Sequence, residues 1–212
     1  MDTVIEQLAE LRLIPVISIP EVKHAIPLAG ALTQAGLPCA EITFRTPAAE
    51  ESIRILSNQF PQLLIGAGTI LNVEQAERAV NAGAKYIVSP GMSPSVVKWC
   101  LENKVTVIPG VATPTEIMAA MGFNLGVLKF FPSENLGGIA MLKALYGPFK
   151  EIKFIPSGGI NPENSPAYLA LPNVLAIGGT WFIKESLIIE GKFDEIEKLT
   201  REAKRLAQKG NG

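Results

Sequence analysis

The sequence predicts a parallel α/β protein, an eight-stranded (β/α)8 TIM barrel. Eight short apolar runs recur at a spacing of about 20–25 residues, and stretches with helical periodicity separate them. Strands that alternate with helices form right-handed βαβ units and a parallel sheet. Eight such units in 212 residues fit one compact domain, residues 1–212. The alternative is a doubly wound open sheet, whose first turn often carries a glycine-rich motif, but the first turn here, ISIPEVKHA, contains no glycine.

The expected strands are runs of five to seven mostly apolar residues. In chain order they are 13–19 (LIPVISI), 39–44 (CAEITF), 63–68 (LLIGAG), 85–89 (KYIVS), 105–109 (VTVIP), 127–131 (VLKFF), 152–157 (IKFIPS) and 174–179 (VLAIGG).

The expected helices carry recognisable start and stop signals. The first amphipathic helix falls in 21–36, and residues 73–83 have an apolar side and end at a glycine. A hydroxyl residue followed by proline begins the helices at Ser93-Pro94 and Thr113-Pro114. The tail 191–209 places apolar residues on one stripe and charges elsewhere.

The amino-acid composition argues against several classes of protein. Hydrophobic residues make up 48% and charged residues 18%, which argues against disorder. The net charge of −1 leaves no basic face for a nucleic-acid backbone. Two cysteines, Cys39 and Cys100, fit a reducing cytosol, and with the single histidine, His24, they nearly exclude a zinc site of the usual His/Cys kind. No signal peptide or membrane-spanning run is visible, so we expect a cytoplasmic protein.

Lys129 stands inside the apolar run VLKFF. Strand alternation places it opposite Leu128 and Phe130, so it points inward if those two side chains face the helices. Burial disfavours the charged ammonium, and a neutral amine is the form that Schiff-base chemistry needs. The alternative is a structural lysine that reaches solvent at the strand end or pairs with a carboxylate.

Glu41 lies in CAEITFRT, on the same strand face as Thr43 and Arg45. An acid and an arginine inside one parallel strand are costly unless they serve a site or pair with each other. If the fold turns Lys129 inward, an inward-facing Glu41 would have an opposite charge as its partner. Cys39 is expected in the core, because no histidine is placed to activate it.

Two glycine pairs end the last two predicted strands, Gly158-Gly159 and Gly178-Gly179. In (β/α)8 barrels the loops at these two positions often bind a phosphate group. Glycine lets backbone N–H groups approach an anion closely. One pair alone marks only a turn, but two pairs about 20 residues apart indicate a phosphate site.

Together these residues resemble a known family, the class I aldolases that cleave 2-keto-3-deoxy-6-phosphogluconate (KDPG) and 2-keto-4-hydroxyglutarate (KHG). Seven ordered motifs carry the resemblance: AEITFRT (40–46), GAGT (66–69), SPG (89–91), PGVATPTE (109–116), KFFPSE (129–134), PSGGI (156–160) and IGGTW (177–181). The resemblance implies a cytosolic homotrimer of (β/α)8 barrels that needs neither metal nor cofactor and acts on a small phosphorylated sugar acid.

The resemblance also implies residue roles. Lys129 would form the Schiff base and Glu41 would be the general acid/base. The substrate-binding residues would be Arg45 and Thr69 for the pyruvyl carboxylate, Pro90 beside them, and Gly158, Gly159, Gly178, Gly179 and Thr180 for the phosphate. Ser157 stands where the family pattern has threonine, and Thr180 where it has serine; both keep a hydroxyl. Ser157 would contact the reacting substrate and help to fix the configuration at C4.

Three alternatives remain open from the sequence. A phosphosugar isomerase or epimerase would use the glycine turns but need no Schiff-base lysine. A metal-dependent aldolase is disfavoured by the single histidine. A non-catalytic sensor of phosphorylated sugar acids would need neither Lys129 nor Glu41.

Overall fold

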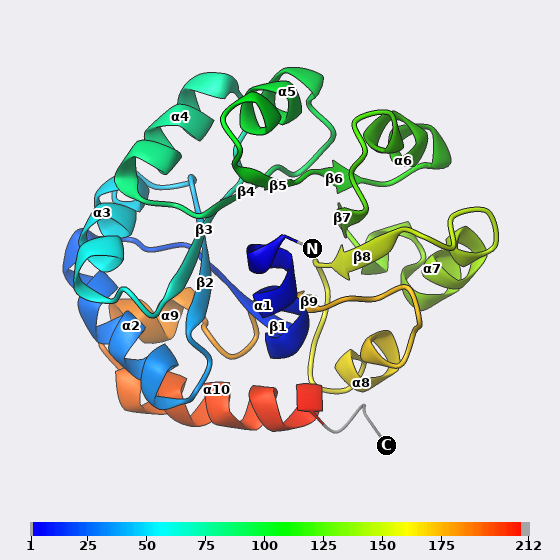
Figure 1. The fold of residues 1–212 in the computed structure, drawn as a ribbon. Coiled ribbons are helices and arrows are strands. Elements are labelled where there is room, and N and C mark those ends of the chain that lie inside the picture. Colours follow the sequence, from blue (N-terminus) through cyan, green and yellow to red (C-terminus); the bar gives the residue numbers. More distant parts are fainter. Residues whose placement is uncertain (1, 209–212) are drawn as a thin grey trace.

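The computed structural model describes residues 2–208, in which parallel strands form a ring with helices on its outside (Figure 1). Each of the eight predicted runs contains a strand, and the strands pair in parallel. The strands are β1 (Leu13–Ile17), β2 (Cys39–Thr43), β3 (Leu64–Gly68), β4 (Tyr86–Val88), β5 (Thr106–Ile108), β6 (Gly110–Val111), β7 (Val127–Phe130), β8 (Lys153–Pro156) and β9 (Ile177–Gly179).

The prediction of a closed eight-stranded TIM barrel is wrong. Hydrogen bonds join the strands into two separate sheets, one of six strands in the order β5-β4-β3-β2-β1-β9 and one of three in the order β6-β7-β8. The first sheet is a parallel half-barrel, and the second faces it across the ring (Figure 1).

Prolines lie at both seams between the sheets. The predicted strand 105–109 contains β5, which pairs with β4, and after Pro109 the chain continues as β6, which pairs with β7 instead. At the other seam the Phe154 amide donates to the Asn173 carbonyl, and the next amide on that side of β8 would belong to residue 156, a proline. Since proline has no N–H, no ladder forms at this seam, and within residues 2–208 only two isolated bridges cross it, Phe154 with Val174 and Ser157 with Gly178.

The helices confirm most of the predicted start and stop signals. Asn72 caps α4, and Gly83 ends it in the left-handed conformation. Thr113 and Glu116 form a capping box at the start of α6, whereas the Ser93 side chain makes no capping hydrogen bond to α5. Lys209, in the predicted tail helix, lies outside the described residues. The helices are α1 (Thr3–Leu11), α2 (Ala25–Gln34), α3 (Ala49–Gln59), α4 (Val73–Ala82), α5 (Pro94–Glu102), α6 (Pro114–Met121), α7 (Gly138–Tyr146), α8 (Ser165–Leu169), α9 (Glu185–Ile189) and α10 (Phe193–Gln208), with 3-10 turns η1 (Val22–His24) and η2 (Glu134–Leu136).

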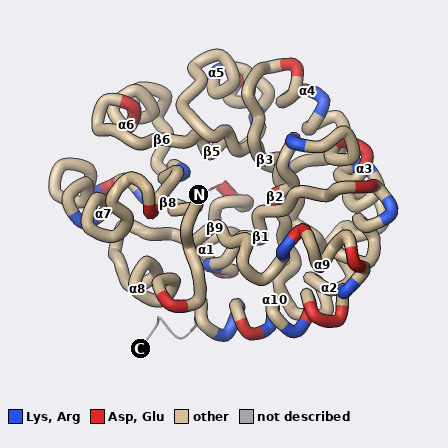
Figure 2. The backbone as a smooth tube through the Cα atoms, turned by 180° about the vertical axis from the view of Figure 1, so that it is seen from behind, with Lys and Arg blue, Asp and Glu red and all other residues tan. Residues whose placement is uncertain are grey.

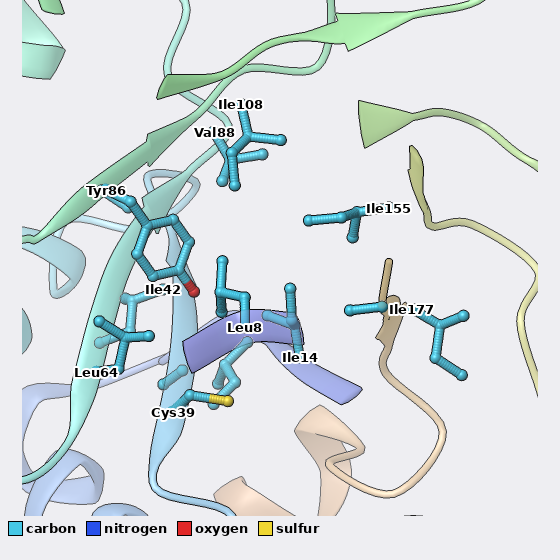
Figure 3. Close-up of a cluster of buried hydrophobic side chains, with 14 of the residues drawn as sticks. Leu8, Ile14, Cys39, Ile42, Leu64, Tyr86, Val88, Ile108, Ile155 and Ile177 are labelled. Carbon is cyan, nitrogen blue, oxygen red and sulfur yellow. The ribbon is translucent and has the colours of Figure 1, made fainter. Parts of the chain in front are cut away.

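Helix α1 lies across the end of the ring where the strands begin (Figure 1). Its Leu8 is fully buried and packs among inward-facing residues of the strands, including Ile14 and Tyr86 (Figure 3). These apolar side chains fill the end of the ring where the strands begin. Polar side chains that face inward are therefore gathered toward the other end, where the strands finish.

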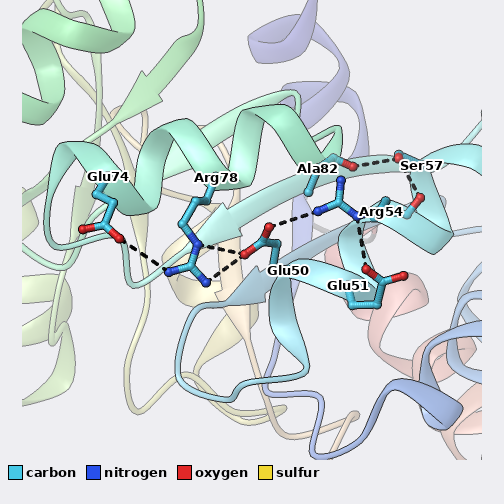
Figure 4. A network of polar contacts seen from close by, with 7 residues as sticks. All are labelled: Glu50, Glu51, Arg54, Ser57, Glu74, Arg78 and Ala82. Carbon is cyan, nitrogen blue, oxygen red and sulfur yellow. Dashed lines mark hydrogen bonds and ion pairs between the residues drawn. The ribbon is translucent and has the colours of Figure 1, made fainter.

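Charged residues of both signs are distributed over the outer helices (Figure 2). Glu50 of α3 accepts hydrogen bonds from Arg54 on its own helix and from Arg78 on α4 (Figure 4). Such exposed pairs are individually weak, but a network ties the two helices together. Within residues 2–208, no helix combines the length and apolar character that crossing a membrane requires.

Candidate active site

Lys129 and Glu41 meet inside the ring. Lys129 is the third residue of β7 and Glu41 the third residue of β2, on opposite sheets, and both side chains face inward as the strand alternation predicts. Lys129 Nζ lies 3.0 Å from Glu41 Oε1, and the side chains are only 8% and 6% exposed. Burying two charges is costly, and this close contact between opposite charges offsets much of the cost.

Two neighbours shape the surroundings of the pair. On β3, Gly68 has no side chain, and a Cβ atom there would lie 2.3 Å from Glu41 Oε1, so glycine leaves room for the carboxylate. The Phe131 ring centroid lies 5.2 Å from Lys129 Nζ, within the range of a cation–π contact. The carboxylate is thus fixed within proton-transfer distance of the amine.

A cavity of about 590 Å³ opens beside this pair, toward the ends of the strands. Seven of the predicted site residues border it: Arg45, Lys129, Ser157, Gly158, Gly159, Gly178 and Thr180. Glu41 is not among the residues that border it; with Lys129 and Ser157 it borders a smaller cavity of about 10 Å³. The reactive pair therefore occupies the inner end of a pocket of small-molecule size.

Arg45, just after β2, lies on the wall of the pocket. Its Nε donates a hydrogen bond to Thr69 Oγ1 at 3.1 Å. Thr69 itself is behind Arg45 rather than on the described lining. Pro90 is also off the lining; its carbonyl oxygen would lie 2.2 Å from a Cβ atom on Gly110, the residue paired with Lys129. Of these three predicted site residues, only Arg45 borders the pocket, and Thr69 and Pro90 lie behind the residues that do.

The glycine turn after β8 has a special backbone. Gly158 and Gly159 adopt φ values of +94° and +80°, which other residues rarely adopt. Gly178 of β9 forms a bridge with Ser157 and borders the pocket, whereas Gly179 packs under the Trp181 ring. Gly158, Gly159, Gly178 and Thr180 border the same cavity as Lys129, and Gly178 also borders the smaller cavity beside Glu41 and Lys129.

No cluster of three or more His, Cys, Asp or Glu side chains suited to a metal ion occurs among the described residues. Cys39 and Cys100 are buried free thiols. His24 is also buried and packs near the Phe193 ring, with the ring centroids 6.5 Å apart. These residues lie in the core and not on the pocket wall.

A model of the KDPG and KHG aldolase family matches residues 4–199. The chain belongs to this family. It is 45% identical over 202 residues to a 2-dehydro-3-deoxy-phosphogluconate (KDPG) aldolase from Treponema pallidum strain Nichols, with 95% of this chain and 96% of that protein covered. The expectation of a carbon–carbon lyase is thereby confirmed for the family to which the chain belongs.

Two solved structures of this aldolase family are also similar. A KDPG aldolase from Legionella pneumophila, with pyruvate captured at low pH as a covalent carbinolamine intermediate, is 40% identical with a TM-score of 0.91, and 94% of this chain and 97% of that chain are covered. The KDPG aldolase of Zymomonas mobilis ZM4 with 3-phosphoglycerate is 36% identical with a TM-score of 0.88, and 94% of each chain is covered.

Sequence reasoning missed residues that support the glycine turn of this aldolase. Backbone amides of Ser133 and Glu134, which follow Lys129 in the motif KFFPSE, donate to the carbonyls of Ser157 and Gly158. The motif could have identified Glu134. Tyr168 of α8 gave no signal, because its contact with Glu134 spans 34 residues of chain.

Tyr168 joins Ser133 and Glu134 in one polar network. Ser133 Oγ and the Tyr168 hydroxyl lie 2.9 Å apart, and that hydroxyl donates to the Glu134 carboxylate. Burial raises the pKa of Tyr168 to about 12, and the hydrogen bond to Glu134 acts in the same direction. The hydroxyl is therefore a stable neutral donor at physiological pH.

Proposed function

We propose that this chain is a class I aldolase that cleaves KDPG to pyruvate and glyceraldehyde 3-phosphate through a Schiff base on Lys129. The same chemistry would cleave 4-hydroxy-2-oxoglutarate to pyruvate and glyoxylate. The observation that carries the proposal is the buried contact of 3.0 Å between Lys129 Nζ and Glu41 Oε1 at the inner end of the pocket.

The first half of the reaction joins the substrate to Lys129. When a keto acid enters, Glu41 takes a proton from the ammonium, and the neutral amine attacks the keto carbon. The carbinolamine that forms loses water and becomes an iminium ion. Glu41 is the acid or base for these proton transfers because its carboxylate already touches Nζ.

The second half breaks the carbon–carbon bond. The iminium draws the electron pair of the C3–C4 bond while Glu41, through a water, takes the proton of the C4 hydroxyl. Glyceraldehyde 3-phosphate leaves, and the enamine of pyruvate stays on Lys129. Glu41 returns the proton to C3, and water hydrolyses the resulting iminium to free pyruvate.

We assign the carboxylate and the phosphate of the substrate to different parts of the pocket. Arg45, held by Thr69, would orient the pyruvyl carboxylate through a charge-assisted hydrogen bond, with Pro90 supporting that wall. The phosphate would lie at the opposite end, against the glycine turns and Thr180. The pyruvate carbinolamine in the Legionella pneumophila relative and the 3-phosphoglycerate in the Zymomonas mobilis relative support the two ligand classes, a keto acid and a phosphorylated acid.

The proposal includes one catalytic domain that needs no metal and assembles as a homotrimer, as family resemblance implies. Sedimentation equilibrium tests the assembly, because a trimer and a monomer of this 22.7 kDa chain differ threefold in mass. Activity that persists after dialysis against EDTA would support the metal-free mechanism, and activity lost there and restored by a divalent ion would overturn it.

Borohydride trapping tests the Schiff base. Pyruvate and borohydride should add one reduced pyruvyl group to the peptide that contains KFFPSE, and Lys129→Ala should abolish the adduct. Lys153→Ala is the matched control: Lys153 also lies on a strand of the smaller sheet, but its Nζ donates to the Pro172 carbonyl. An adduct on Lys153 or Lys85, or no adduct at all, would overturn the proposal in favour of another residue or an isomerase.

A further inference from the structure

Three cationic side chains are found among the described residues that line the 590 Å³ pocket: Arg45, Lys129 and Lys184. Two of them are engaged, since Lys129 pairs with Glu41 and the Arg45 Nε donates to Thr69. Lys184 makes no ion pair within residues 2–208, and its side chain is exposed. It is a free positive charge on the wall of a ligand-sized cavity.

The backbone places Lys184 at the outer end of the pocket. After β9, the Ile183 amide donates to the Thr180 carbonyl and turns the chain. Lys184 follows directly and precedes α9, where its carbonyl accepts from the Leu187 amide. Its side chain thus borders the same cavity as Gly159 and Thr180.

The glycine turns and Thr180 offer a phosphate ester only uncharged hydrogen-bond donors. A phosphate monoester carries a charge of about −1.5 to −2 at neutral pH, whereas backbone N–H groups and the Thr180 hydroxyl are uncharged donors. An ammonium on a long flexible stem supplies the missing charge and three donors. Lys184 can therefore supply the positive charge that the uncharged donors at this phosphate site do not have.

We propose that Lys184 binds the phosphate of the substrate and sets the preference of this enzyme for phosphorylated over unphosphorylated 2-keto acids. This inference rests on the proposed function, because it takes the glycine turns as the phosphate end of the pocket. Lys184 is a specificity-determining residue in this scheme and takes no part in the chemistry at Lys129.

The next residue provides a control of opposite sign. Glu185 also borders the pocket, and its carboxylate repels a dianion there. Removing the negative charge at 185 should strengthen phosphate binding, whereas removing the positive charge at 184 should weaken it. Lys192, which is exposed and pairs with Glu190 at 2.6 Å, serves as a lysine outside the pocket.

The decisive experiment compares KDPG with 2-keto-3-deoxygluconate, the same acid without its phosphate. At low ionic strength, Lys184→Gln should lower the kcat/KM ratio of KDPG to 2-keto-3-deoxygluconate about tenfold, mainly through the KM for KDPG. Glu185→Gln should raise that ratio, and Lys192→Gln should leave it unchanged. An unchanged ratio in Lys184→Gln, or the same loss in Lys192→Gln, would overturn the inference.

Inorganic phosphate binding separates this inference from the proposed function. Calorimetry should give a Kd for phosphate about tenfold weaker in Lys184→Gln than in the wild type, a readout that needs no catalysis. Borohydride trapping of pyruvate in the same variant should match the wild type. If the wild type traps no pyruvate, the aldolase mechanism fails; if trapping is normal but phosphate affinity is equal in both proteins, the role of Lys184 fails.

Discussion

The side chain of Glu134 occupies the space that a Cβ atom on Gly159 would need, since that atom would lie 2.5 Å from Glu134 Cγ. Glycine at 159 thus has two causes, this close approach and its φ of +80°. The Tyr168 hydroxyl in turn binds the Glu134 carboxylate. The turn after β8 therefore rests on a polar network that joins the segment after Lys129 to α8.

Removal of the Tyr168 hydroxyl should destabilise the protein. In Tyr168→Phe, the Glu134 carboxylate loses its donor and the buried Ser133 hydroxyl loses its partner, so the free energy of unfolding should fall by about 1–3 kcal/mol. Urea denaturation measures the change. Tyr146→Phe is the control, because the Tyr146 hydroxyl makes no hydrogen bond among the described residues. Equal losses of stability in the two variants would show that the hydrogen bonds of Tyr168 do not stabilise the protein.

Replacement of Glu41 should impair proton transfer more than binding. In Glu41→Gln, kcat should fall by about 10²-fold or more, the usual scale for a positioned acid–base group. Some borohydride-trapped pyruvate adduct should persist, because the amide leaves Lys129 in place. Steady-state kinetics and trapping measure the two effects. A kcat near that of the wild type with a raised KM would instead assign Glu41 to substrate binding.

The two thiols should be unreactive in the folded protein. Burial raises the pKa of Cys100 to about 12 and raises the pKa of Cys39 well above its usual value, so little thiolate forms at pH 8. Native protein should therefore release almost no thionitrobenzoate from Ellman's reagent, whereas protein in guanidinium should release two equivalents. A fast-reacting thiol in the native protein would contradict the assignment of both cysteines to the core.

The inward orientation of Lys129 and Glu41 could be predicted because strand alternation has a fixed period of two. The open seams could not be predicted from apolar runs alone, since they depend on which edge of the strand Pro109 and Pro156 present to a neighbour. Tyr168 was missed for another reason: nothing local marks a contact that only the folded chain makes.

Ser157 provides the last prediction. Its side chain is buried at the end of β8, borders the pocket, and lies against the bare face of Gly178, where a Cβ atom would be 2.9 Å from Ser157 Oγ. Serine lacks the β-branch that restricts threonine at χ1, so the direction of its hydroxyl is less fixed. We expect normal cleavage of KDPG but weak discrimination against its C4 epimer.

Three proteins test this expectation. Ser157→Thr should sharpen the ratio of kcat/KM for the two epimers, and Ser157→Val, which matches threonine in shape but lacks the hydroxyl, should erode it. The expected change is about 1 kcal/mol, the net contribution of one ordinary hydrogen bond and equal to about a fivefold change in the ratio. The measurement is kcat/KM for both epimers with wild type and both variants. Three equal ratios would show that the hydroxyl at 157 does not set the configuration at C4.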